Sequence, residues 1–498
     1  MPRRFDVVVV GGGNAALCAA LSASEAGASV LVLEKAPEAE RGGNTTFTAG
    51  AMRVVYRDAE DIYSLVPDLT AEEKEMTDFG SYDEGQFFDD MARITESRAD
   101  ADLTEVLVTR SFSTLSWMRS KGVRFLPIYG RQAFKVDGKF TFWGGLTLEV
   151  SGGGPGLVEA LTSAAIKDGV EISYGSRALE LVMDDTQVVG VRFRKDNKVT
   201  EVSAGGVVLA AGGFQSNTEW RARYLGPNWD LAKVRGTRFN TGDGISMALQ
   251  ANAMPWGHWS GCHAVGWEMN APPFGDLRIG DSYQKHSYPF SIMVNAHGKR
   301  FVDEGADFRN YTYAKYGREI LAQPGQFAWQ VYDAKVIHLL RDEYRIREVT
   351  KVSADTIEGL AAKLDGVDAA AFLRTVADYN DSVGTDVPFN PNIKDGRRTS
   401  GLDVPKSNWA NTIDQGPFEA YAVTCGITFT FGGIRINTDA AVIDCEENVI
   451  AGLYACGEMV GGVFYFNYPG GSGLTNGSVF GRIAGANAAT STRKTPPA

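Results

Sequence analysis

A glycine-rich turn near the N-terminus has the composition and spacing of a site that binds phosphate groups. Residues 11–16 read Gly-Gly-Gly-Asn-Ala-Ala. Gly11 permits a tight turn, Gly13 lets the backbone approach a pyrophosphate, and Ala16 allows the following helix to pack close to a sheet. The first N–H groups of that helix would offer positive potential to the phosphates. Glu34, 23 residues after Gly11, is placed to accept a hydrogen bond from a ribose hydroxyl.

The segments around this turn follow the order strand, turn, helix, strand. Residues 5–10 are a continuous apolar run, which is typical of a buried parallel strand. Residues 17–26 have helical periodicity and end at a glycine, and residues 29–33 form the next apolar run. This order predicts a Rossmann-like unit that binds a dinucleotide, and a glycine-rich turn without function is the alternative.

Four further glycine-rich segments favour FAD over a nicotinamide cofactor. They are residues 41–51, 207–214, 240–244 and 452–458. Segments so widely separated around one Rossmann-like unit suit a long cofactor that runs through the fold. The sequence contains no second unit of this kind for NAD(P). Residues 152–156 are also rich in glycine, but no acidic residue ends a strand at the required distance, so they predict a loop and a helix start.

The composition limits the classes of function. A chain of 498 residues is long enough for two domains. Its net charge of −12 argues against a nucleic-acid partner, and an anionic substrate would need a local cluster of Arg or Lys. The five cysteines form no metal, haem or iron–sulfur motif, so no metal site is predicted. No apolar run is long enough for a signal peptide or a membrane span, and we expect a cytoplasmic protein.

The glycine-rich segments resemble those of the fumarate reductase and succinate dehydrogenase flavoprotein family, which includes the 3-ketosteroid Δ1-dehydrogenases. The most specific segments are residues 42–45, 209–214, 241–244, 298–304 and 452–458. Within the family, the chain is most similar to the tricarballylate dehydrogenases, judged by residues 11–16, 303–309 and 467–473. The resemblance implies an α/β fold. A Rossmann-like FAD-binding domain would comprise residues 1–250 and 427–498, and an inserted α+β capping domain residues 251–426.

The resemblance also implies how FAD is held. Relatives with covalent flavin carry a His at the position of Asn44, so we expect the flavin here to be bound without a covalent bond. The expected cofactor contacts are Gly11, Gly13, Asn14, Ala15, Ala16, Glu34, Lys35, Gly42, Gly43, Asn44, Thr45, Thr46, Gly212, Gly213, Asp243, Glu458, Ser472, Gly473 and Leu474.

Removing hydrogen across a carbon–carbon bond requires a hydride acceptor, flavin N5, and a side chain that takes the proton. In fumarate-reducing relatives an Arg shortly after the segment ending at Glu304 transfers this proton, and Arg309 is the nearest match, one position further along. In the steroid dehydrogenases a Tyr does so, which makes Tyr311 and Tyr313 alternatives. Guanidinium is effectively always protonated, so Arg309 would need a perturbed site or a proton relay. It could instead clamp a carboxylate or pair with Glu304 or Asp307.

Two positions depart from the dicarboxylate pattern of the family. Phe429 stands where fumarate reductases carry a substrate-binding His, and Tyr468 stands where they carry a clamping Arg. Tyr468 instead matches the tyrosine that polarises a ketone in the steroid enzymes together with the N–H of a later glycine. Fumarate and succinate are therefore disfavoured as substrates. His258, Thr430 and Gly471 complete the expected substrate contacts.

Three functions follow from these residues. The first is a dehydrogenase that converts tricarballylate to aconitate, which Arg309 favours. The second is a desaturase or enoate reductase acting beside a ketone, which Tyr468 and the negative net charge favour. The third, a flavin-binding protein without turnover, leaves the Arg and Tyr residues without a purpose. Because the chain has no haem or iron–sulfur motif, its electrons must pass to a separate partner. The resemblance implies that this partner is an iron–sulfur or quinone-linked protein.

Overall fold

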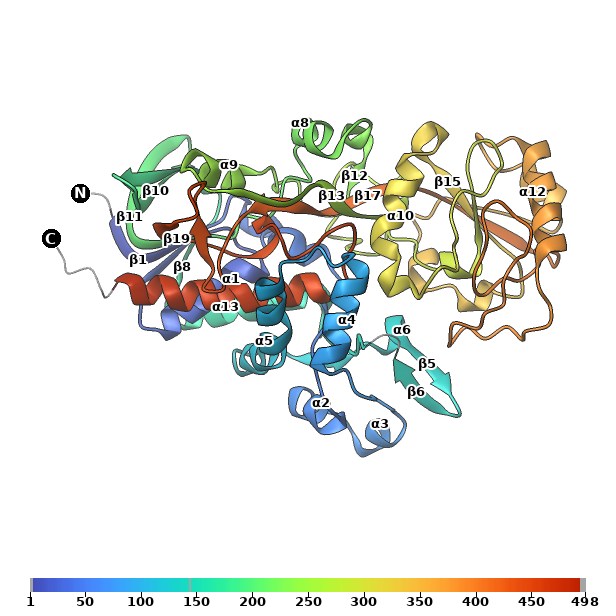
Figure 1. The fold of residues 1–498 in the computed structure, drawn as a ribbon, viewed down its shortest axis with the longest axis horizontal. Helices are drawn as coiled ribbons and strands as arrows, with labels where there is room; N and C mark the ends of the chain where they lie inside the picture. The colour runs from blue at the N-terminus through green and yellow to red at the C-terminus, as the bar shows by residue number, and fades with distance from the viewer. Residues whose placement is uncertain (1–2, 143–144, 493–498) are drawn as a thin grey trace. The chain divides into compact units, whose positions relative to one another are not determined.

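The computed structural model describes residues 3–142 and 145–492, and these form two compact units (Figure 1). The N-terminal unit comprises Met1–Pro227, Gly236–Cys262 and Phe429–Ala498. The middle unit comprises Asn228–Arg235 and His263–Thr428. Two long strands, β13 (Pro255–Glu268) and β17 (Phe418–Ile434), run from one unit into the other. The sequence led us to expect the corresponding boundaries after residues 250 and 426.

The N-terminal unit is built on a mixed eight-stranded sheet. Strand β1 (Arg3–Val10) lies between β2 (Val30–Leu33) and β11 (Lys198–Leu209) and is parallel to both. On the far side of β11, strand β19 (Val449–Ala455) is also parallel. The last four residues of β1 are buried, as their uninterrupted apolar sequence predicts. The predicted Rossmann-like order of strand, turn, helix and strand is confirmed, and α1 (Asn14–Glu25) begins directly after the turn.

Helix α13 (Ser472–Thr492) packs along α1 in the same unit (Figure 1). Glycines allow the close approach, because a Cβ atom on Gly481 would lie 2.4 Å from the Ala15 carbonyl oxygen, and one on Gly485 would lie 2.0 Å from that of Ala19. Residue numbers at these contacts increase together along α1 and α13, so the two helices are parallel. Their N-termini therefore lie at the same end, where both can offer free N–H groups.

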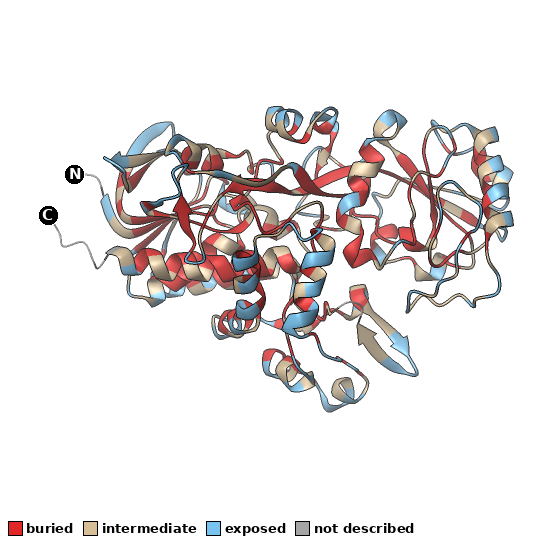
Figure 2. Ribbon diagram, in the orientation of Figure 1, coloured by how far each residue is buried: buried red, intermediate tan, exposed pale blue. Residues whose placement is uncertain are grey.

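The middle unit contains a six-stranded sheet in which β17 has the most neighbours. Strands β14 (Ile292–Val294) and β15 (Ala328–Tyr332) extend it antiparallel, and β16 (Lys351–Ala354) pairs with β17. Helix α12 (Ala369–Ser382) packs its apolar side on this sheet and contributes Phe372 and Val376 to the core. Buried residues accordingly concentrate in the strands and on the inner sides of the helices (Figure 2).

The remaining elements are short or peripheral. In the N-terminal unit the further strands are β3 (Ala51–Met52), β4 (Phe125–Pro127), β5 (Ala133–Val136), β6 (Lys139–Phe142), β7 (Leu148–Val150), β8 (Glu171–Ser173), β9 (Arg177–Asp184), β10 (Gln187–Lys195) and β18 (Ala441–Ile443). The further helices there are α2 (Ala59–Leu65), α3 (Ala71–Glu75), α4 (Glu84–Ile94), α5 (Ala101–Ser120), α6 (Tyr129–Gln132), α7 (Gly153–Lys167), α8 (Thr218–Trp220) and α9 (Asp243–Gln250). The middle unit adds β12 (Lys233–Val234), α10 (Tyr313–Leu321) and α11 (Ile357–Ala361). Within residues 3–142 and 145–492, no helix combines the length and apolarity that a membrane span requires.

Candidate functional site

The predicted phosphate-binding turn and its acidic partner lie together in the N-terminal unit. Gly11 has φ +118°, and a Cβ atom there would lie 2.3 Å from the carbonyl oxygen of Ala210. Glu34 is buried against the turn, because a Cβ atom on Gly12 would lie 2.5 Å from its carboxylate. Burial raises the pKa of Glu34, and the Ala36 N–H donates to its carboxylate at 2.6 Å. Glu34 thus lies directly beside the turn, and its hydrogen bond to a ribose hydroxyl stays a prediction.

Asn14 connects three of the segments expected to hold the cofactor. Its backbone N–H donates to the Thr45 hydroxyl at 3.0 Å, in the turn η2 (Gly43–Phe47). Its side-chain amide donates to the Leu474 carbonyl oxygen at 2.8 Å and to the Ser478 hydroxyl at 2.9 Å. The Asn14 side chain therefore joins α1 to α13, and its backbone joins α1 to the η2 turn.

Lys35 and Asp243, both expected to contact the cofactor, form an ion pair with each other at 2.9 Å. Lys35 also donates to the Thr241 hydroxyl at 2.6 Å, and Arg177 reaches Asp243 at 3.1 Å. Burial favours the neutral form of Asp243, but the hydrogen bonds and charges of Lys35 and Arg177 outweigh it and lower the pKa of Asp243. These contacts fix the end of β2 to the start of α9.

Glu458 is the centre of a polar cluster at the end of β19, in the turn η10 (Gly457–Met459). Its carboxylate accepts from the Thr430 backbone N–H at 2.9 Å, from Gln215 at 3.2 Å and from Asn240 at 3.4 Å. Loss of hydration raises the pKa of Glu458 to about 7. Gly213 must be a glycine here, because a Cβ atom would lie 2.4 Å from the Glu458 carboxylate. Two residues expected to contact the cofactor thus meet with Thr430, which we expected to contact substrate.

Tyr468 lies in an aromatic cluster of the same unit. Its ring centroid is 5.1 Å from that of Phe464, 5.9 Å from that of Phe429 and 6.4 Å from that of Phe431. Because side chains alternate along a strand, Phe429 and Phe431 point to this cluster while Thr430 points to Glu458. A Cβ atom on Gly473 would lie 3.7 Å from the Tyr468 hydroxyl, which places the phenol at the first turn of α13.

His258 packs against the aromatic cluster that contains Tyr468. Its ring stacks on Tyr465 at 5.7 Å and on Phe431 at 6.4 Å between centroids. Its Nδ1 atom accepts from the Phe466 backbone N–H at 3.0 Å. His258 therefore supports the loop that leads to Tyr468.

Arg53 holds the other side of the Tyr468 loop. The side chain is completely buried and donates to the Gly470 carbonyl oxygen at 2.9 Å. It also forms an ion pair with Asp90 at 3.1 Å and donates to the Tyr82 hydroxyl at 2.8 Å. The Gly471 carbonyl oxygen accepts from the Arg53 backbone N–H at 3.1 Å. Arg53 and Gly471 thus join the loop to strand β3.

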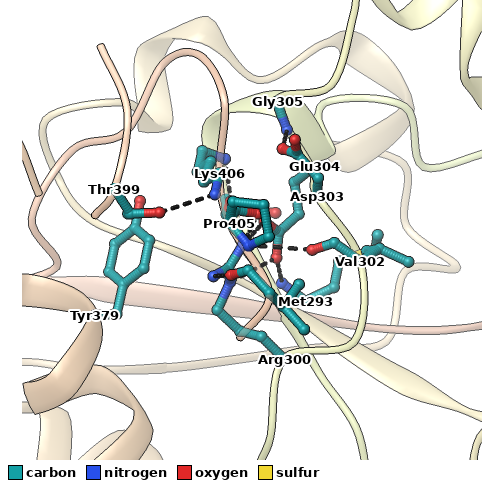
Figure 3. A network of polar contacts seen from close by, with 12 residues as sticks. Met293, Arg300, Val302, Asp303, Glu304, Gly305, Tyr379, Thr399, Pro405 and Lys406 are labelled. Atoms are coloured by element: carbon teal, nitrogen blue, oxygen red, sulfur yellow. Dashed lines mark hydrogen bonds and ion pairs between the residues drawn. The ribbon is translucent and has the colours of Figure 1, made fainter. Parts of the chain in front are cut away.

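Arg309 and Tyr311 lie in the buried turn η6 (Arg309–Tyr311) of the middle unit. The segment leading to this turn is fixed by the network drawn in Figure 3. In it, Glu304 pairs with Arg300 at 2.5 Å and accepts from the Met293 backbone N–H at 2.8 Å. Glu304, one of the two carboxylates that sequence analysis offered as ion-pair partners of Arg309, is thus bound to Arg300. The other, Asp307, forms an ion pair with Lys394 at 3.3 Å.

The residues after η6 add tyrosine and histidine side chains. The Thr312 and Tyr288 hydroxyls lie 2.7 Å apart. Burial raises the pKa of Tyr288 far above its usual value, although the Thr312 hydrogen bond and the Arg309 charge oppose this. The Tyr313 ring contacts His263 with centroids 4.9 Å apart, and burial and the charge of Arg235 lower the pKa of His263 well below its usual range. Both shifts favour the uncharged forms of Tyr288 and His263, the side chains that contact Thr312 and Tyr313 just after the proposed proton-transfer segment.

The N-terminal unit fits an FAD molecule in its polar groups as well as in its glycines. The buried Asn476 side-chain oxygen on α13 has no hydrogen-bond partner in the part of the chain that the structure describes, and flavin carries a ring N–H that needs such an acceptor. Sequence analysis did not select Asn476, Gln215 or Asn240. Asn240 is the first residue of the glycine-rich segment 240–244, and Gln215 and Asn476 lie within a few residues of other expected cofactor contacts. This proximity was the only signal that could have indicated them. Over residues 3–142 and 145–492, no three His, Cys, Asp or Glu side chains are grouped to hold a metal ion.

Comparison with known proteins identifies relatives over almost the entire chain. The FAD binding domain family matches residues 6–474. A probable fumarate reductase, Ifc3, of Shewanella frigidimarina is 33% identical over 493 residues, which cover 97% of this chain and 74% of that protein.

Two solved structures share the fold. The open conformation of a flavocytochrome c3 fumarate reductase has a TM-score of 0.73 and 28% identity, covering 98% of this chain and 79% of that one. The 3-ketosteroid delta1-dehydrogenase of Sterolibacterium denitrificans, bound to 1,4-androstadiene-3,17-dione, has a TM-score of 0.74. Its identity is 20%, with coverage of 98% and 100%, which shows the fold alone. The predicted Rossmann-like FAD-binding fold is thereby confirmed.

Proposed function

From the premise that this chain belongs to the FAD binding domain family and is an FAD-dependent oxidoreductase acting on CH–CH groups, we propose that it dehydrogenates a carbon–carbon single bond beside a carboxylate. The proposed substrate is tricarballylate and the product is aconitate. Electrons would leave to a separate iron–sulfur or quinone-linked protein, in the cytoplasm.

The observation that carries this proposal is the buried position of Arg309 in η6. A buried guanidinium is retained where an anion or a hydrogen-bonding partner compensates its loss of hydration. A substrate carboxylate supplies two acceptor oxygens in the geometry that guanidinium binds best.

FAD and three side chains of this protein would each have a separate role in the reaction. FAD, held by the N-terminal unit, supplies the hydride acceptor when bound. Arg309 would bind a substrate carboxylate and take part in moving the proton, with Tyr311 as the neighbouring alternative. Tyr468 would donate a hydrogen bond to a substrate oxygen and so acidify the adjacent C–H bond.

A second candidate function is desaturation beside a ketone. The aromatic cluster around Tyr468 favours it, because Phe429, which packs against Tyr468 and is only partly buried, would present an apolar ring that suits a fused-ring substrate better than a small polyanion. In this case Tyr468 would polarise the ketone, and Arg309 would have a supporting role.

Anaerobic bleaching of the flavin absorbance separates these functions. Purified protein would be mixed with tricarballylate, succinate, citrate or a 3-ketosteroid in the absence of oxygen. Rapid bleaching by tricarballylate alone is the expected result. Bleaching by the steroid alone would favour the second function, and no bleaching by any of the four would contradict both substrates.

A further inference from the structure

Asn310, the middle residue of η6, has a buried side chain without a partner. It is 2% exposed, and neither its side-chain oxygen nor its nitrogen forms a hydrogen bond with any residue that the structure describes. Leaving both groups of a buried amide unpaired is unfavourable, so native proteins rarely do so unless a ligand or bound water completes the site. The two flanking residues, Arg309 and Tyr311, are the proposed substrate and proton-transfer groups.

The turn that carries Asn310 is fixed by its own hydrogen bonds. The Tyr311 backbone N–H donates to the Phe308 carbonyl oxygen at 2.9 Å, and the Thr312 N–H donates to that of Arg309 at 3.1 Å. The Thr312 side chain is in turn bound to Tyr288. The backbone is therefore held on both sides of Asn310 while its carboxamide remains unpaired.

The chemistry of a carboxamide defines the group that would satisfy it. Its nitrogen only donates and its oxygen only accepts, so its best partner both accepts and donates. An ionised carboxylate accepts only, and would leave the Asn310 oxygen unpaired and repelled. A protonated carboxyl or a second carboxamide can form two antiparallel hydrogen bonds with it.

We propose that Asn310 is a substrate-recognition residue that binds a neutral carboxyl or carboxamide group of the substrate through two hydrogen bonds, next to an ionised carboxylate at Arg309. This inference rests on the proposed function, because it places substrate at η6. For tricarballylate, it means that the enzyme binds the form with one carboxyl protonated. A monoamide of tricarballylate would mimic that form at every pH.

The test compares Asn310→Leu with Asn408→Leu in the flavin-loaded protein. Asn408 is a matched control, because it is also buried in the middle unit but its amide nitrogen and oxygen are both hydrogen-bonded: the nitrogen donates to the Gly305 carbonyl oxygen at 2.8 Å, and the oxygen accepts from the Gly396 N–H at 2.9 Å. With flavin bound and no substrate present, the melting temperature relative to the wild type should fall clearly for Asn408→Leu and stay unchanged or rise for Asn310→Leu. An equal fall in both would overturn the inference, whatever the substrate is.

The second measurement follows KM and kcat for tricarballylate between pH 5.5 and 8, because the fraction with a protonated carboxyl falls as the pH rises. For the wild type, KM should rise as the pH rises, and the monoamide should bind with a pH-independent KM. Asn310→Leu should raise KM about tenfold or more with a smaller effect on kcat, and should remove the preference for the monoamide. A wild-type preference that survives in Asn310→Leu would overturn the inference but leave the proposed function standing. If tricarballylate does not reduce the wild-type flavin, the proposed function fails and the melting temperatures alone decide the role of Asn310.

Discussion

The side-chain oxygen of Asn44 accepts a hydrogen bond from the backbone N–H of Thr237 at 2.9 Å. Asn44 stands at the position where, by the resemblance described above, relatives with covalent flavin carry a His. Its amide has no ring nitrogen that could bond to the isoalloxazine. We therefore expect heat or acid denaturation to release all of the flavin. The absorbance should remain in the supernatant after the protein is precipitated. Flavin fluorescence that stays with the polypeptide on a denaturing gel would contradict this prediction.

The buried pair of Arg53 and Asp90 should be far more important for stability than an exposed pair of the same residue types. Arg53→Met removes the buried guanidinium from the Gly470 carbonyl oxygen and from the Asp90 carboxylate, which keeps the Tyr82 hydroxyl and Arg93 as donors. We expect the free energy of unfolding to fall by about 3 kcal/mol. The control is Arg57→Met, since Arg57 pairs with Asp61 at 2.9 Å but is 83% exposed. The control should leave the free energy of unfolding nearly unchanged. Urea unfolding measures both, and equal effects would show that Arg53 has no special role.

The flavin-binding half of the fold was predictable because its signals are local. The apolar runs of β1 and β2, the glycines between them and the acid at position 34 each reflect a short-range requirement of a strand, a turn or a helix start. The structure shows these elements in the predicted order. It also confirms the loop and helix start predicted at residues 152–156, where α7 begins at Gly153.

The partners of the site residues were not predictable, because they come from distant parts of the chain. Nothing in the sequence near Arg53 indicates Gly470 or Asp90, and nothing near Glu458 indicates Gln215. Thr430 illustrates the same point. The sequence places it beside Phe429 in a substrate segment, but strand alternation turns its side chain toward Glu458.

The stability of the flavin-free protein should depend on the ionisation of Glu458. The pKa of this carboxyl is about 7 in the folded chain, against an ordinary value of 4.5, so the folded state binds more protons between these two pH values. Its stabilising contribution is complete below pH 4.5 and is lost as the pH rises through 7. Glu458→Gln cannot titrate. We expect the free energy of unfolding of the wild type, relative to this variant, to fall by about 1–3 kcal/mol from pH 5 to pH 8. A difference that does not change with pH would contradict the raised pKa.

The seam between α1 and α13 should tolerate a methyl group at one glycine and not at another. Gly485→Ala places a Cβ atom 2.0 Å from the Ala19 carbonyl oxygen, so the helices must separate, and we expect a loss of about 3 kcal/mol or more and weaker flavin retention. In Gly477→Ala the nearest atom, on Asn14, is 3.3 Å away. There the higher helix propensity of Ala, about 1 kcal/mol, can offset the small displacement. Thermal melts and flavin content of both variants test this difference, and an equally stable Gly485→Ala would show that the seam is not tightly packed.

The choice between arginine and tyrosine as the proton-transfer group can be made from the kinetics of three primary variants and Arg309→Lys. If Arg309 moves the proton, Arg309→Gln should lower kcat by about 10²–10⁴-fold with flavin still bound, while Tyr311→Phe has a small effect. If Arg309 only binds a carboxylate, Arg309→Gln should mainly raise KM, and Tyr311→Phe should lower kcat. Tyr468→Phe should lower kcat/KM by about 10²-fold in either case, because it removes a donor to the substrate oxygen.

Arg309→Lys shows whether the positive charge alone is enough for activity, since a lysine keeps the charge but cannot bind a carboxylate through two parallel hydrogen bonds. Full activity in all three primary variants would remove Arg309, Tyr311 and Tyr468 from the mechanism and leave only the flavin assignment.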